Sequence, residues 1–224
     1  MKANATILIL SICYLVMLVT ILAVEKINTG QPRNDKLHSA DLVALNYLHV
    51  ILMAVMTLAS CIINPLPYFL MQFPDRISTY QLAAFLITFG VISFLPWKKF
   101  SHFVTLSQHF LPATTSGIAM YASLRTVFLV IYEWFFRGLL LVSCSVWLGI
   151  YWGIAINVLL YTLLHANKSK KEMFGCIPFG LMVCVFTIWW QSIWPAIIFH
   201  LQIAVVNEWP LLQKFNSLQK QNAL

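Results

Sequence analysis

Long apolar segments recur along the whole chain, and they constrain its fold more than any other feature. Each is about 20 residues long, the length that an α-helix needs to cross the hydrocarbon core of a bilayer. Of the 224 residues, 60% are hydrophobic and 9% are charged, whereas about a quarter of a soluble domain is charged. We therefore expect an integral membrane protein, and we exclude a cytosolic enzyme, a nucleic-acid-binding domain and a disordered tail.

Charged residues, Pro and Gly divide the apolar sequence into about seven spans. A further segment, 97–116, is too polar to cross the membrane and too apolar to be a free loop, so we expect an interfacial or re-entrant helix there. The predicted fold class is all-α: a polytopic membrane helical bundle of about seven transmembrane helices plus this one. The predicted spans are 5–24, 42–62, 79–96, 117–146, 150–167, 173–190 and 193–209.

Lysine and arginine are distributed unequally between the two sides that these spans define. Ten lie on one side and two on the other, so the positive-inside rule places the N-terminus outside and the C-terminus in the cytoplasm of a multi-pass cell-membrane protein. The ten are Lys26, Arg33, Lys36, Lys98, Lys99, Lys168, Lys170, Lys171, Lys214 and Lys220, and the two are Lys2 and Arg76. The lipid bilayer is the predicted partner, no nucleic-acid partner is expected, and the sequence does not indicate an oligomeric state.

Glu133 is the only acidic residue deep inside a predicted span. A charge in the hydrocarbon layer costs several kcal/mol, so an ionisable residue there indicates a function when it has a partner. Arg137 follows four residues later on the same helix face, in the order that favours an ion pair. The pair neutralises itself in lipid, and it fits either a reactive site or a lock between helices.

Two histidines, His165 and His200, lie within later spans at a depth similar to that of Glu133. At a rise of 1.5 Å per residue, Glu133 and His165 are equally far from the turn at Gly149, and His200 is roughly 12 Å deep. An acid, an arginine and two imidazoles at one depth are the groups that general acid–base hydrolysis requires. The alternative is that both histidines only hydrogen-bond to neighbouring helices. Spacing alone supports the hydrolytic and the structural interpretation equally.

Three short motifs resemble those of a known family. Glu133-Trp134-Phe135-Phe136-Arg137-Gly138 resembles the first motif, Glu-Glu-x-x-x-Arg, of the CAAX protease and bacteriocin-processing (CPBP, or Abi) intramembrane proteases, a family that includes CAAX prenyl protease 2 and proteins like lysostaphin resistance protein A. The segment from Tyr161 to His165 resembles the second motif, Phe-x-x-x-His. The segment from Trp194 to His200 resembles the third, and the resemblance covers roughly residues 115–207.

Two positions depart from the family pattern. When the motifs are aligned on Arg137, the first Glu of the family falls on Tyr132, and the second is Glu133. When they are aligned on His200, the expected Asn falls on Ala204, with Asn207 one turn further along nearly the same face. The chain is therefore either a divergent protease or a catalytically silent relative.

The resemblance implies an intramembrane endopeptidase, of glutamic or metallo type, that hydrolyses a membrane-associated peptide or protein near the cytoplasmic face. Glu133, with His165, is the expected activator of water, Arg137 orients Glu133, and His200 stabilises the oxyanion. Tyr132, Asn207 and Asn157 are candidate helpers. The alternative is an inactive pseudoprotease that binds a membrane or peptide partner in an immunity or scaffolding role.

Metal dependence stays open in this interpretation. We expect no cofactor, but His165, His200 and Glu133 are a ligand set that zinc accepts. The resemblance also divides the chain into N-terminal membrane helices with the interfacial segment (1–110), a catalytic helical core (111–210) and a cytoplasmic tail (211–224).

Overall fold

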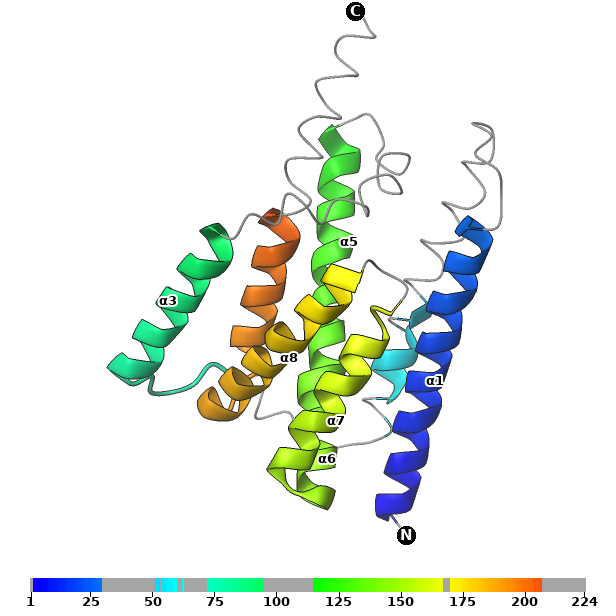
Figure 1. Cartoon of the computed structure of the whole chain (residues 1–224), viewed down its shortest axis with the longest axis horizontal. Coiled ribbons are helices and arrows are strands. Elements are labelled where there is room, and N and C mark those ends of the chain that lie inside the picture. The colour runs from blue at the N-terminus through cyan, green and yellow to red at the C-terminus, as the bar shows by residue number, and fades with distance from the viewer. Residues whose placement is uncertain are drawn as a thin grey trace, which may run out of the picture.

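The computed structural model describes residues 2–29, 51–52, 54–59, 62, 72–94, 115–166 and 170–206. In these ranges all regular elements are helices, as the all-α prediction requires. Figure 1 shows α1 (Lys2–Thr29) and α3 (Thr79–Phe94) at opposite flanks of the bundle, with the other labelled helices between them.

The centre of the bundle is one long helical rod that changes its hydrogen-bonding pattern midway. It consists of α5 (Thr115–Glu133), the π-helix η4 (Trp134–Leu140) and α6 (Leu141–Leu148). The chain then turns into α7 (Ile150–Leu163), which is followed by α8 (Lys170–Trp190). A short turn after α8 leads into the helix Trp194–Val206.

Six of the predicted spans coincide with these helices to within a few residues. In the remaining span, 42–62, the described residues 51–52, 54–59 and 62 are helical. Two helices, Ala122–Leu148 and Glu172–Trp190, are long and apolar enough to cross a membrane, and four shorter apolar helices accompany them. The number of crossings and their orientation stay predictions. Most of the predicted interfacial helix at 97–116, Asn207 and the tail at 211–224 lie outside the described residues.

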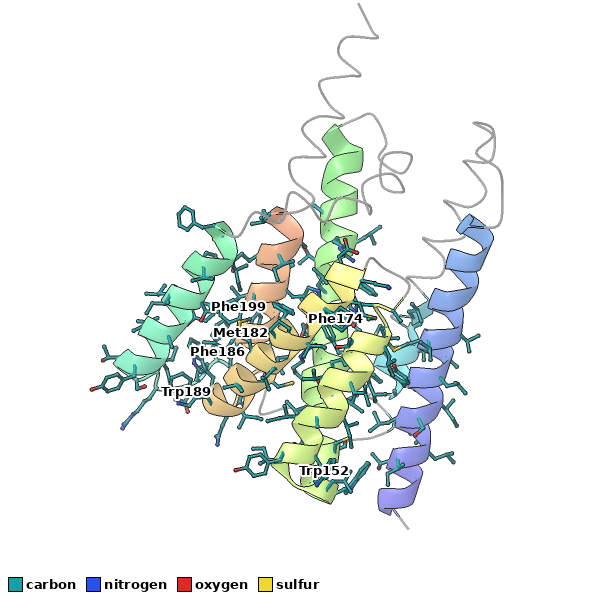
Figure 2. The ribbon with its side chains drawn as sticks, in the orientation of Figure 1. Trp152, Phe174, Met182, Phe186, Trp189 and Phe199 are labelled. Atoms are coloured by element: carbon teal, nitrogen blue, oxygen red, sulfur yellow. The ribbon has the colours of Figure 1, made fainter. Side chains whose placement is uncertain are left out.

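The outer surfaces of the helices are apolar. Large hydrophobic side chains are exposed along α1, α3, α7 and α8, and a continuous apolar surface of this kind is unfavourable in water. In Figure 2, Trp152, Phe174 and Trp189 lie on this surface, and Phe186 and Phe199 pack inside. Examples of exposed side chains are Leu8, Ile12, Leu15, Val19, Leu86, Ile87, Phe94, Phe174, Ile177, Leu181 and Val185. This surface fits a lipid environment.

α6 and α7 form a tight hairpin whose turn and packing both depend on glycine. Gly149 ends α6 with φ +88°, a conformation that L side chains rarely adopt. One turn later, a Cβ on Gly153 would lie 2.8 Å from the backbone nitrogen of Ser145. The two backbones are therefore in direct contact, as is common where helices pack through small residues in membranes. This contact sets Asn157 and Tyr161 of α7 beside η4.

Replacing Gly153 with alanine should destabilise this hairpin. The added methyl group must push the two backbones apart, and overpacking of this kind typically costs about 1–3 kcal/mol. Gly175→Ala in α8 is the matched control, because a Cβ there meets nothing within 4 Å. Thermal unfolding in lipid nanodiscs measures both variants. Equal melting temperatures for the two would contradict the close approach at Gly153.

Candidate active site

Glu133, Arg137 and His200 form a buried polar cluster. Nη1 of Arg137 lies 3.1 Å from Oε2 and 3.3 Å from Oε1 of Glu133, and both side chains have no exposed surface. Nδ1 of His200 lies 2.5 Å from Oε1 of the same carboxylate. A carboxylate only accepts, so Nδ1–H of His200 donates. In the neutral ring, Nε2 therefore has the lone pair.

The acid and the arginine lie at the junction between two kinds of helix. Glu133 is the last residue of α5, and Arg137 is in the π-helix η4. Leu141 N–H donates to the carbonyl oxygen of Phe136 five residues earlier, the spacing of a π-helix. The predicted i,i+4 ion pair is present, but it spans a widened turn that the sequence analysis did not predict. Such π turns occur often at functional sites.

Asn157 supports that widened turn from the neighbouring helix. Its Nδ2 donates to the carbonyl oxygen of Phe136 at 2.6 Å. Its Oδ1 accepts from Sγ–H of Cys184 on α8 at 3.2 Å. Asn157 was predicted to be a helper of the reaction, and in the structure its amide has partners on two neighbouring helices.

Aromatic rings surround the polar cluster. Cζ of Arg137 lies 4.6 Å from the ring centroid of Tyr161, a cation–π contact. The imidazoles of His165 and His200 lie 4.8 and 6.4 Å from the same ring. Tyr161 is thus the group that both histidines contact. The ring occupies the first position of the Phe-x-x-x-His-like motif, where the sequence analysis expected an aromatic residue.

His165 lies in the turn that follows α7 and is hydrogen-bonded to that helix. Its Nδ1 lies 2.9 Å from the carbonyl oxygen of Tyr161, which only accepts, so Nδ1–H donates. The neutral ring then has its lone pair on Nε2. His165 is partly buried.

Tyr132 stands where the family has its first Glu, and it also lies in the site. Its ring is 5.7 Å from that of His200 and 4.6 Å from that of Phe136. The side chain is 6% exposed, and among the described residues its hydroxyl has no hydrogen-bond partner. A buried, unpaired hydroxyl is a donor that a ligand's carbonyl oxygen can use.

The third motif is present only in part. Ala204, one turn after His200, is buried and has an apolar side chain, so it donates nothing to the site. In the part of the chain that the structure describes, no three His, Cys, Asp or Glu side chains converge as a metal would require. The zinc alternative built on His165, His200 and Glu133 stays untested.

Two contributors to the site were missed from the sequence: the thiol of Cys184 and the carbonyl of Phe136. A backbone carbonyl has no sequence signal of its own, and a lone cysteine in an apolar segment is typical of an ordinary packing residue. Gly138 was a weak signal for an irregular turn, because glycine is unfavourable in a helix interior. A Cβ there would lie 3.1 Å from the Trp134 ring.

Comparison with known proteins agrees with the motifs. Residues 114–206 match the family described as type II CAAX prenyl endopeptidase Rce1-like, a segment that is less than half of the chain and includes the whole polar cluster. A search found no matching curated protein and no matching solved structure. The match confirms the resemblance predicted from the three motifs: the segment 114–206 is similar to the Rce1-like type II CAAX prenyl endopeptidases.

Proposed function

We propose that this chain is an intramembrane endopeptidase that hydrolyses a peptide bond of a membrane-associated peptide or protein near the cytoplasmic face. The observation that supports it is the buried cluster of Glu133, Arg137 and His200 inside the segment that matches a peptidase family. Burying these groups in an apolar bundle is unfavourable, so their presence there indicates a function. The N-terminus is outside the cell in this proposal.

We assign the general base to Nε2 of His200 rather than to Glu133, which the sequence analysis favoured. Glu133 has no exposed surface, whereas the His200 side chain is 13% exposed, so the imidazole is the member of the pair with surface open to a water molecule. Glu133 then fixes the tautomer of His200 and stabilises the imidazolium that forms, the arrangement known from serine-protease triads. Arg137 balances the buried carboxylate and orients it.

Side chains of this chain can carry out each proton transfer of the hydrolysis. Water gives a proton to Nε2 of His200 while its oxygen bonds to the carbonyl carbon of the substrate. The carbonyl electron pair moves to oxygen, where the O–H of Tyr132 donates to the developing oxyanion. The C–N bond then breaks, and the imidazolium of His200 returns the proton to the leaving nitrogen. His165, which contacts the same Tyr161 ring as His200, helps to orient the attacking water.

A second candidate function rests on Tyr132. If the first carboxylate of the family is required for hydrolysis, a tyrosine in its place leaves a buried site that still binds an acceptor group through its hydroxyl. The chain would then be a pseudoprotease that holds a membrane-associated peptide without cutting it.

Two substitutions at Tyr132 discriminate between these functions. If the chain is a peptidase, Tyr132→Phe should lower kcat by about 10²–10³, the usual effect of losing one oxyanion donor. The measurement is peptide cleavage by purified protein in lipid nanodiscs, read by mass spectrometry. A wild type that binds peptides without cleaving them, together with cleavage by Tyr132→Glu, would overturn the peptidase assignment and support the pseudoprotease.

A further inference from the structure

A chain of hydrogen bonds joins three helices behind the polar cluster. Sγ–H of Cys184 in α8 donates to Oδ1 of Asn157 in α7, and Nδ2 of Asn157 donates to the carbonyl oxygen of Phe136 in η4. All three residues are completely buried. The orientation of the Asn157 amide is fixed by its partners, because a backbone carbonyl only accepts and a thiol donates to oxygen.

The accepting carbonyl belongs to the turn that departs from α-helical geometry. In an α-helix Phe136 would receive the N–H of residue 140, four positions on. It receives that of Leu141 instead, five positions on, and Asn157 is its second donor. A carbonyl has two lone pairs, and the wider π turn exposes the second one to a side chain from a neighbouring helix. Asn157 therefore favours the π turn over a regular one.

The orientation of Arg137 depends on this turn. A π-helix inserts one residue, so the residues within it are rotated progressively, and those after it by about 100°, relative to an uninterrupted α-helix. Arg137 follows Phe136 directly, and its guanidinium lies between the carboxylate of Glu133 and the ring of Tyr161. A change of register at Phe136 would rotate Arg137 about the helix axis and so shift its guanidinium relative to the carboxylate and the ring.

We propose that Asn157, held in place by Cys184, is a positioning residue: it keeps η4 in its π register and so directs Arg137 toward the Glu133–His200 pair. Asn157 itself touches neither substrate nor water in this role. The part of this inference that concerns catalysis rests on the proposed function, whereas the part that concerns the register does not.

The first readout is the protonation of His200 Nδ1, observed by ¹⁵N NMR of histidine-labelled protein in nanodiscs and assigned with His200→Gln. In the wild type, Nδ1–H donates to Glu133 and its signal is protected from exchange with water. Asn157→Leu removes both hydrogen bonds at similar side-chain volume. The signal should then shift or exchange at least tenfold faster.

The second readout is catalysis. Asn157→Leu should lower kcat about 100-fold with KM changed less than threefold, because a misplacement of about 1 Å at a site has an effect of that size. Cys184→Ser keeps a donor for Oδ1 and should stay within threefold of the wild type. Cys184→Ala leaves Oδ1 unpaired and should fall between the two. Thr187→Ala is the control, since among the described residues its hydroxyl bonds within α8, to Val183 O.

The outcomes separate this inference from the proposed function. An unchanged His200 signal in a folded Asn157→Leu protein overturns the positioning role and leaves the peptidase proposal intact. A changed signal in a protein whose wild type cleaves nothing supports the positioning role and counts against the peptidase. If Asn157→Leu does not fold, the Cys184→Ala and Cys184→Ser pair decides: equal His200 signals in both would overturn the inference.

Discussion

Replacing Arg137 with methionine should destabilise the bundle by about 3–5 kcal/mol, the usual cost of leaving one partner of a buried ion pair uncompensated. The pair has no exposed surface, so water cannot solvate the carboxylate of Glu133 once the guanidinium is gone. The aromatic ring of Tyr161 would also lose the cation that lies against it. Thermal unfolding in nanodiscs measures the effect.

The double variant Glu133→Met and Arg137→Met is the matched control for this prediction. Replacing both members of a buried pair by apolar side chains is often neutral or stabilising, so the double variant should recover most of the lost stability. It should still be inactive, because His200 has lost its carboxylate. A double variant as unstable as Arg137→Met alone would show that the ion pair is not the source of the destabilisation.

The second large effect is expected at His200. His200→Ala should lower kcat by about 10²–10⁴, the usual contribution of a general base. Its fold should survive, because Glu133 keeps Arg137 as a partner and the imidazole is at the partly exposed edge of the cluster. Glu133→Gln should be both less active and less stable, since it leaves Arg137 without a buried counter-charge.

His102→Ala is the control for His200, because His102 lies outside the segment that matches the family. It should retain the wild-type rate of peptide cleavage. Comparing the two variants shows which residue is the general base. If both proteins fold and His200→Ala retains a residual rate well above that of Glu133→Gln, the general base is Glu133 and not His200.

The helices and the polar cluster could be predicted from the sequence because their signals are local. Apolar segments of about 20 residues give the helices, and counting residues from a turn gives depth. That count placed Glu133 near His200, which are 67 residues apart and form a hydrogen bond in the structure. The ion pair between Arg137 and Glu133 could be predicted from their spacing of four residues alone.

The support behind the cluster could not be predicted. The π turn depends on which donor reaches the carbonyl of Phe136, and that donor, Asn157, comes from another helix. The partner of Asn157 is Cys184, which lies 27 residues further on. In the sequence, this cysteine cannot be distinguished from an ordinary packing residue. Contacts of this kind depend on how helices rotate about their axes, which small residues such as Gly153 determine through packing.

The most direct test of the account is peptide hydrolysis by the wild type and by His200→Ala, side by side, in lipid nanodiscs and H₂¹⁸O. A broad set of membrane-anchored peptides serves as substrate, and mass spectrometry reads the products. We expect the wild type to yield fragments with one ¹⁸O atom in the new carboxylate and His200→Ala to yield them at least about 100-fold more slowly. Equal cleavage by both folded proteins, or binding without cleavage by the wild type, would contradict it.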